Sequence, residues 1–300
     1  MEQPKGECKM TKQADVLRLL FPQWQGGNNP NYAFGAELLH FIAPEGKNSK
    51  TIRIPVAENY NEELSVQEGI TAGSAMSTQA DNARTVLEKH QPEKIIIYGG
   101  DCSIDLMPFD YLSGKYREKL GIIMLDAHPD ITRSKDTTHA HESLISDLMG
   151  KSDGLLSDKV MYPIKQNQVL FGGLIEEKLR PQEDLVKGLN LPILSPEVLA
   201  ETSEPIINWI KENGFEYLAI HLDLDVLSPR DFRAILPAEP GLDAAAFPAA
   251  VGEMTLKQIV RIFKDLAKET ELVGLGIAEH MPWDAINLRN ALTEIDIFNE

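Results

Sequence analysis

The chain has 300 residues, of which 43% are hydrophobic and 25% are charged, a composition typical of a globular protein with a sizeable core. Its 46 acidic residues outnumber its 29 basic residues and give a net charge of −17, which argues against nucleic acid and anionic membrane surfaces as partners. The sequence has no apolar run near the ~20 residues of a membrane helix, no signal-peptide pattern, and only two cysteines, Cys8 and Cys102. These features predict a cytoplasmic protein in a reducing compartment.

The first third of the chain is predicted to mix strands, helices and one unusual loop. The polar segment 1–13 is expected to be flexible, and an apolar cluster at 16–21 predicts a strand. The loop 22–30 is rich in turn-forming residues and either lines the rim of a binding cleft or only connects two elements. Further along we expect a helix at 36–42, an edge strand at 51–57, where Pro55 disfavours a central position, and a helix within 65–90.

The rest of the chain continues the alternation of strands and helices. Buried strands are predicted at 94–100, 121–126, 168–172, 191–194, 217–224 and 272–278. Helices are predicted at 204–213 and 256–268, the second with Thr255 as its N-cap. This order predicts one α/β domain over residues 1–300, with a doubly wound, mostly parallel sheet between two layers of helices.

The segment 121–130 carries the clearest functional signal. Its apolar run ends in Asp126, His128 and Asp130, which stand at every second position. Alternate side chains of an extended chain point the same way, so these three side chains can reach one site. Open α/β sheets also bind their ligands at the carboxyl ends of their strands. We therefore predict a metal site at the end of this strand.

Acidic residues recur at the ends of two other predicted strands. Asp223 and Asp225 come at the end of the strand at 217–224, and Asp101, followed by Cys102, comes directly after the strand at 94–100. Burying two like-charged carboxylates together costs several kcal/mol unless a cation balances them. The candidate ligands are too many for one transition-metal ion and suit two: Cys102, Asp126, His128, Asp130, Asp223 and Asp225. Oxygen-rich ligation favours Mn²⁺ over Zn²⁺, and two such ions would lower the pKa of a shared water.

Three motifs resemble, in order and spacing, the signatures of the ureohydrolase family, which includes arginases, agmatinases and formimidoylglutamases. They are Gly-Gly-Asp-Cys-Ser at 99–103, Asp-Ala-His-Pro-Asp at 126–130 and His-Leu-Asp-Leu-Asp-Val-Leu-Ser-Pro at 221–229. The match covers roughly residues 94 to 283. The resemblance implies an arginase-like α/β fold, a dinuclear manganese centre and a homo-oligomer. It also implies hydrolysis of a C–N bond in a small guanidino or amidine substrate, usually with release of urea.

The resemblance also assigns metal-binding roles by position. Asp126 and Asp223 match the two carboxylates that bridge the ions. Asp130 matches a ligand of one ion, and it could also accept a hydrogen bond from the attacking hydroxide. His128 and Asp225 match ligands of the other ion.

Two further residues match groups that act on the substrate. Glu279 matches the glutamate that holds the substrate guanidinium, a role that a charge-assisted hydrogen bond suits. His141 matches a loop histidine that carries protons to the leaving amine, and His139 is an alternative for the same role.

The chain departs from the family pattern in three places. Cys102 stands where the family has a histidine ligand, so it either remains a ligand and shifts the preference toward Zn²⁺ or Fe²⁺, or is a buried thiol beside a weakened site. We favour two bound metal ions. Ser228 replaces an aspartate that is not a ligand. The segment 131–136 lacks the asparagine of arginases and has Arg133 and Lys135, which could bind a carboxylated substrate or only face solvent. Neither arginine nor agmatine is supported as the substrate.

Two other classes of function compete with the urea-releasing hydrolase. One is a non-catalytic ligand-binding or regulatory relative whose metal site is degraded by the change to Cys102. The other is a hydrolase of formimino or amide substrates. The presence of five other candidate ligands and of Glu279 favours an enzyme, because a silent site has no chemical need for them.

Overall fold

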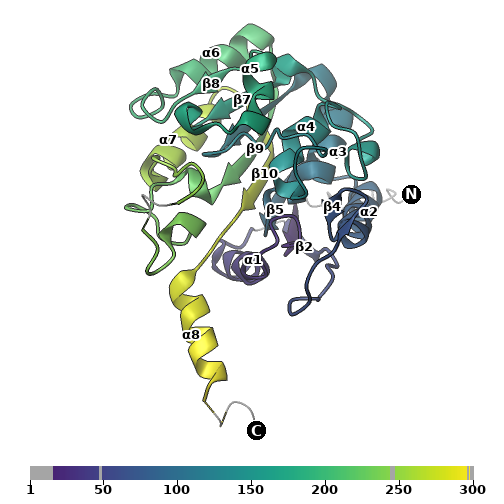
Figure 1. The fold of residues 1–300 in the computed structure, drawn as a ribbon. Coiled ribbons are helices and arrows are strands. Elements are labelled where there is room, and N and C mark those ends of the chain that lie inside the picture. Colours follow the sequence, from purple (N-terminus) through teal and green to yellow (C-terminus); the bar gives the residue numbers. More distant parts are fainter. Residues whose placement is uncertain (1–15, 47–48, 244–246, 296, 298–300) are drawn as a thin grey trace, which may run out of the picture.

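The computed structural model describes residues 16–46, 49–243, 247–295 and 297. Its centre is an eight-stranded sheet with the order β2-β1-β5-β10-β9-β6-β7-β8, in which all neighbouring strands are parallel (Figure 1). The strands are β1 (Val16–Phe21), β2 (Ser49–Arg53), β5 (Lys94–Gly99), β6 (Leu120–Leu125), β7 (Val169–Gly172), β8 (Ile193–Leu194), β9 (Tyr217–Asp223) and β10 (Glu271–Ala278). The segment 1–13 lies outside the described residues.

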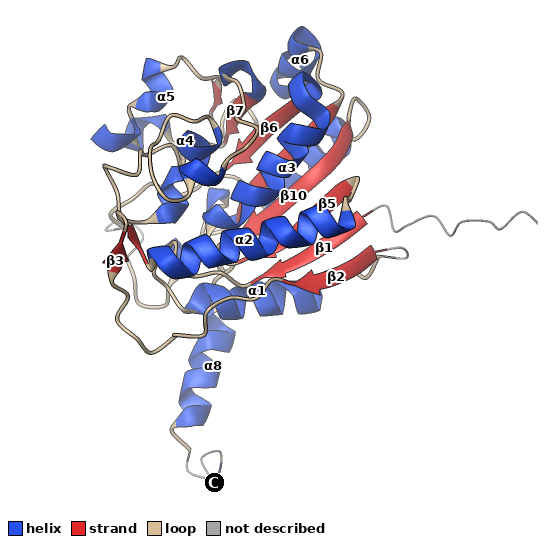
Figure 2. Cartoon of the chain, turned by 90° about the vertical axis from the view of Figure 1, so that its right-hand side faces the viewer, coloured by secondary structure: helices blue, strands red, loops and turns tan. Residues whose placement is uncertain are grey.

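Helices cover both faces of the sheet, which confirms the predicted three-layer α/β fold (Figures 1 and 2). Apolar side chains of α2, α3, α4 and α5 pack against one face, and those of α6 and α7 pack against the other, where α1 lies behind β1 and β2 in Figure 2. The helices are α1 (Asn31–Ile42), α2 (Gly73–His90), α3 (Leu106–Tyr116), α4 (Leu144–Leu148), α5 (Leu185–Gly188), α6 (Glu204–Asn213), α7 (Leu256–Leu266) and α8 (Trp283–Thr293). None of the described helices is long and apolar enough to cross a bilayer.

Strand β6 shows why an uninterrupted apolar run becomes a central strand. All six of its residues are buried. Ile122 and Met124 point into the core under α2–α5, whereas Ile123 and Leu125 point into the core under α6 and α7. Because successive side chains of a strand alternate between its faces, a strand with helices on both sides needs apolar residues at every position.

Two predicted elements differ from the structure near the N-terminus. The segment 65–72, predicted as helical, contains the hairpin strands β3 (Val66–Gln67) and β4 (Ile70–Thr71), and α2 begins only at Gly73. Gly69 and Ala72 adopt positive φ angles of 89° and 54°, a conformation that a right-handed helix does not contain. Strand β2 is an edge strand, as Pro55 suggested, but it ends at Arg53.

Other boundaries shift, and two long helices were not predicted. Helix α1 starts at Asn31 rather than at residue 36, and α7 ends at Leu266. The Thr255 hydroxyl accepts a hydrogen bond from the Gln258 amide, which confirms the predicted N-cap of α7. Helix α3 is buried nearly all round, so its sequence lacks the amphipathic period that marks a surface helix. Helix α8 was also missed and extends away from the sheet (Figure 1).

Candidate metal centre

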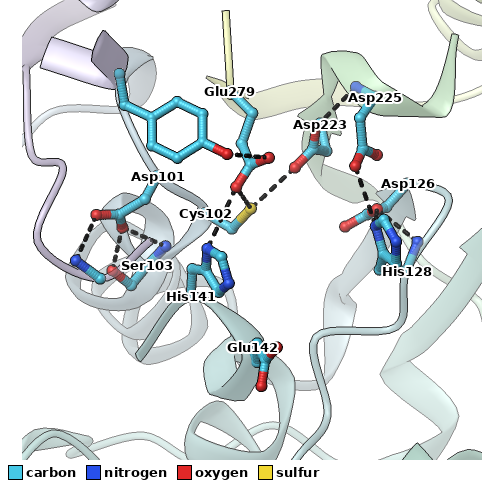
Figure 3. A network of polar contacts seen from close by, with 12 residues as sticks. Asp101, Cys102, Ser103, Asp126, His128, His141, Glu142, Asp223, Asp225 and Glu279 are labelled. Carbon is cyan, nitrogen blue, oxygen red and sulfur yellow. Dashed lines mark hydrogen bonds and ion pairs between the residues drawn. The ribbon is translucent and has the colours of Figure 1, made fainter. Parts of the chain in front are cut away.

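Four neighbouring strands bring the candidate ligands to one edge of the sheet. Cys102 follows β5, Asp126 follows β6, Asp223 ends β9 and Glu279 follows β10. Since β5, β10, β9 and β6 are adjacent and parallel, their carboxyl ends meet (Figure 3). Cys102, Asp223 and Glu279 line a cavity of about 110 Å³. The structure therefore brings together residues that lie far apart in the sequence.

Among the described residues, four groups of potential ligands have their ligand atoms within 4.8 Å of one another, and two of these groups contain five of the six predicted ligands. We call the first group the Cys102 cluster, and it contains Cys102, Asp126, His221 and Asp223. We call the second the His128 cluster, and it contains Asp126, His128 and Asp225. Asp126 belongs to both clusters. A third group joins Asp223 and Asp225 to Glu279, so Asp223 also reaches beyond its own cluster.

The carboxylates of these clusters are crowded and dehydrated. Asp126 and Asp223 are 1% and 2% exposed. Burial raises the pKa of Asp126 to about 6, and burial together with the charges of Asp225 and Glu279 raises the pKa of Asp223 well above its usual range. These shifts mean that the carboxylates resist ionisation unless positive charge is near. Divalent cations would supply that charge.

Unpartnered polar atoms point to the same conclusion. Asp130 and members of the two clusters have five side-chain atoms that are buried without a hydrogen-bond partner in the described part of the chain. They are Asp126 Oδ2, His128 Nε2, Asp130 Oδ2, His221 Nε2 and Asp225 Oδ1. All five atoms are of kinds that ligate metals, and leaving such atoms unpaired costs about 1–3 kcal/mol each. The residues therefore fit a pair of divalent ions, whose identity the donor atoms constrain but do not fix.

The Cys102 thiol lies inside the ring of carboxylates. Its Sγ is 2.9 Å from Asp223 Oδ2, to which it donates a hydrogen bond, and 3.5 Å from Glu279 Oε1 (Figure 3). Burial and the charges of Asp130 and Asp223 raise the pKa of the thiol well above its ordinary value. A cation would reverse this shift by favouring the thiolate. The geometry thus supports the interpretation in which Cys102 remains a ligand.

The imidazole of His128 is held by carboxylates of its own cluster. Its Nδ1 lies 3.1 Å from Asp225 Oδ2, and its backbone amide donates to Asp126 Oδ1 at 2.7 Å. Burial lowers the pKa of His128, but Asp225 and Asp126 outweigh this effect and raise it well above its ordinary value. The ring is 19% exposed and lines the cavity.

Asp130 and Glu279 both have a strained backbone conformation. Their φ angles are 44° and 59°, in the left-handed region that non-glycine residues avoid at a cost of roughly 1–3 kcal/mol. Such strain persists where the surrounding structure requires a side chain in one place. Asp130 lines the cavity but stands outside the ligand groups formed by the described residues. Its predicted role as a ligand stays a prediction.

Glu279 is fixed by two neighbours that also line the cavity. The Tyr32 hydroxyl donates to Glu279 Oε2 at 2.9 Å, and His141 Nδ1 lies 3.3 Å from Glu279 Oε1, an ion-pair distance (Figure 3). Burial lowers the pKa of His141, but the Glu279 carboxylate reverses the effect and raises it to about 9. His139 is packed against His141, at 5.9 Å between ring centres, and does not line this cavity. The geometry favours His141 over His139 as the proton carrier.

The sequence model of the arginase family matches residues 45–298 of this chain. The chain belongs to the arginase family. The ureohydrolase resemblance and the arginase-like fold class are thereby confirmed. No curated protein sequence matches this arginase-family chain significantly.

Solved structures of arginase-family proteins share the fold at low sequence identity. Entamoeba histolytica arginase in complex with L-ornithine matches with a TM-score of 0.74 and 15% identity, over 91% of this chain and 93% of that chain. Bacillus subtilis arginase matches with a TM-score of 0.68 and 17% identity, over 89% and 90%. Proclavaminate amidino hydrolase from Streptomyces clavuligerus matches with a TM-score of 0.60 and 15% identity, over 93% and 85%.

Tyr32 and the loop before it belong to the site of this arginase-family protein, but the sequence did not identify them as site residues. Tyr32 follows the loop 22–30, which packs against the site: the Gly26 amide donates to Asp101 Oδ2 at 2.9 Å. A Cβ on Gly26 would lie 2.7 Å from Ser103 Oγ, so this close approach requires glycine. These contacts favour the interpretation of the loop as part of the cleft. Its turn-forming composition was the available signal.

The structure bears on the two alternatives for Arg133 and Lys135, which were binding of a carboxylated substrate or exposure to solvent only. Arg133 pairs with Asp136 at 3.2 Å and is absent from the residues that line the cavity, as is Lys135. Arg180 does line the cavity, and its Nη1 lies 2.7 Å from Glu142 Oε1. A carboxylated substrate is therefore not supported by Arg133 or Lys135.

Proposed function

We propose that this protein hydrolyses a C–N bond of a small guanidino or linear amidine substrate with the help of two divalent metal ions. The observation that carries the proposal is the pair of ligand clusters that share Asp126 at the wall of a cavity lined by Glu279. One shared carboxylate between two adjacent ligand groups is the arrangement that a bridged pair of ions requires. Membership of the arginase family supports the same reaction class.

Five of the six predicted metal ligands belong to the two clusters, and Asp130 lines the same cavity. Asp126 belongs to both clusters and would be a ligand that the two ions share, and Asp223 is proposed for the same role from its match to the family motif. His128 and Asp225 would complete one site, and Cys102 with Asp130 would contribute to the other. We propose Mn²⁺ first, with Zn²⁺ or Fe²⁺ as alternatives because of the thiolate. When bound, such a pair of ions supplies a nucleophile from water at neutral pH and polarises the substrate.

Glu279 is proposed to orient the substrate. Its carboxylate is buried, faces the cavity and is held by Tyr32 and His141. A guanidinium or amidinium group can form a charge-assisted pair with this carboxylate, which would fix the reacting carbon relative to the two clusters. The cavity of about 110 Å³ suits a small group rather than a bulky substrate.

His141 is proposed to move the proton that the leaving amine needs. It lines the cavity beside Glu279, and its pKa of about 9 keeps it protonated near neutral pH. A protonated imidazole at Nδ1 or Nε2 can donate to a nitrogen that leaves a tetrahedral carbon. Positive charge nearby would lower this pKa, because it disfavours the charged form of the imidazole.

The test is product release from a panel of substrates, with protein loaded separately with Mn²⁺, Zn²⁺ and Fe²⁺. The panel contains arginine, agmatine, guanidinobutyrate, guanidinopropionate and guanidine, assayed for urea, together with formimino compounds assayed for formamide and amides assayed for the released acid. Metal-dependent urea release from one compound, lost in Glu279→Ala, would support the proposal. Release only from an amide would contradict the guanidino and amidine class. A metal-loaded protein that turns over nothing, also as Cys102→His, would favour the ligand-binding alternative.

A further inference from the structure

His221 is a buried histidine that no predicted role uses. It lies on β9, two residues before Asp223, so the alternation of side chains along the strand directs it to the same side as this acid. Its side chain is 0% exposed. Its Nδ1 lies 2.8 Å from Oδ2 of Asp105, which is also fully buried and ends the short 3₁₀ helix that begins at Cys102. The two titratable groups, His221 and Asp105, are thus paired inside the protein next to the Cys102 cluster.

The second nitrogen of His221 has no partner of its own. Nε2 is buried and makes no hydrogen bond to any described residue. His221 is nevertheless a member of the Cys102 cluster, within 4.8 Å of the ligand atoms of Cys102, Asp126 and Asp223. With Nδ1 bound to a carboxylate, Nε2 is the nitrogen left for the cluster. Metal-binding histidines are held in this way, with the other ring nitrogen donating to a carboxylate.

Strand β10 leaves room for the carboxylate that holds His221. A Cβ on Gly276 would lie 1.8 Å from Asp105 Oδ2 and 2.1 Å from Asp105 Oδ1. No heavier side chain fits there unless Asp105 moves. A buried ion pair by itself is weak support for stability, and a purely structural pair would not explain the unpartnered Nε2. The space opposite Gly276 instead serves to place a carboxylate against one nitrogen of His221.

We propose that His221, through Nε2, is a ligand of the metal ion in the Cys102 cluster, and that Asp105 is the positioning residue that orients its ring. This inference rests on the proposed metal centre. His221 would supply an imidazole ligand from inside β9, whereas the family motif normally has its histidine at position 102. The Cys102 cluster then offers one thiolate, one imidazole and two carboxylates, whereas the His128 cluster offers oxygen and nitrogen only. The mixed sulfur and nitrogen set favours Zn²⁺ or Fe²⁺ in the Cys102 cluster, and the His128 cluster suits Mn²⁺.

The inference is tested by metal binding rather than by turnover. Zinc-loaded wild-type protein should show two imidazole ligands per pair of ions by X-ray absorption at the zinc edge, one from His128 and one from His221. His221→Asn should reduce this to one imidazole and weaken one of the two ions in competition with a chelator. Asp105→Asn and Gly276→Ala should weaken the same ion by roughly 10–100-fold. His40→Asn, on α1, is the matched control and should change neither quantity.

A double variant guards against a folding defect. If His221→Asn loses the ion because an imidazole is missing, Cys102→His combined with His221→Asn should regain the imidazole count and most of the affinity. The folding control is that apo His221→Asn has the melting temperature of the apo wild type. If this variant then keeps two tightly bound ions with an unchanged imidazole count, the inference is overturned. A wild type that binds two ions with one imidazole would also overturn it, while leaving the proposed function intact. A wild type that binds no divalent ion would remove the proposed function itself.

Discussion

The two ligand clusters share Asp126 but are built in different ways. In the His128 cluster, Asp126 and His128 come from the turn directly after β6, and the His128 ring lines the cavity with 19% of its side chain exposed. In the Cys102 cluster, ligands come from the ends of three strands, and His221 sits within β9 with no exposure. In the first cluster, two of the three residues come from one local motif and Asp225 follows the neighbouring strand β9, whereas the second cluster draws on three strands. One centre can therefore combine residues that line the cavity with a histidine that is buried inside the sheet.

Replacing the shared carboxylate of Asp126 should have the largest effect on the number of bound metal ions. Asp126→Asn should remove both ions, because each cluster loses a ligand, and should abolish hydrolysis. Asp225→Asn alters only the His128 cluster of the two and should leave one tightly bound ion. Metal affinity should fall by more than the ~100-fold that marks outer partners of a site. Elemental analysis after metal loading and desalting gives the stoichiometry, and equal losses in both variants would contradict the division into clusters.

Removing His141 should impair the reaction while leaving both clusters filled. His141→Asn is expected to lower kcat by about 10²- to 10⁴-fold, the range for loss of a general acid or base. The matched change His139→Asn should have little effect on kcat, because His139 does not line the cavity. Steady-state kinetics with a metal count on the same samples makes the comparison. A larger loss in the His139 variant would transfer the role to that residue.

Weakening Glu279 should affect substrate binding more than metal binding. Glu279→Gln keeps the size of the side chain but removes its charge, which should lower kcat/KM by roughly 10–100-fold, as for loss of a hydrogen bond to a charged group. Tyr32→Phe removes the single hydrogen bond at 2.9 Å and should cost only several-fold. If Glu279→Gln instead releases an ion, this residue is a ligand rather than a substrate anchor.

Asp147 provides a buried acid outside both clusters and should give the smallest effect. Burial raises its pKa to about 7, although Ser152 and Ser134 hydrogen-bond to it. In the unfolded chain the group ionises near its ordinary pKa of 3.8, so folding loses stability as pH rises from about 4 to 7. Asp147→Asn should therefore stabilise the protein more at pH 8 than at pH 5, by about 2 kcal/mol. Urea unfolding at both pH values measures this, and an equal effect would contradict the raised pKa.

The difference between the clusters also explains what the sequence could predict. Every central strand and the candidate ligands Asp126, His128, Asp223 and Asp225 follow from apolar runs that end in alternating polar residues, a rule that needs only neighbouring residues. Position 221 obeys the same alternation, but its place inside an apolar run made it look like core. The alternation of His221 with Asp223 was thus visible in the sequence, but the apolar neighbours of His221 indicated a core position.

Other residues of the site could not be derived from local sequence at all. Asp105 meets His221 only because β5 and β9 both neighbour β10 in the sheet, and Gly276 makes room for it only in that order. Tyr32 reaches Glu279 across 247 positions of sequence. Such contacts depend on strand order, which the alternation of elements leaves open.

The most direct test of the dinuclear account is a titration of the apo protein with one metal, in which the amount bound and the rate of product release are measured in the same samples. Because both ligand clusters are proposed to act together, the rate should rise more than linearly with bound metal and reach its plateau at two equivalents per chain. A rate that rises linearly and reaches its plateau at one equivalent would contradict the account.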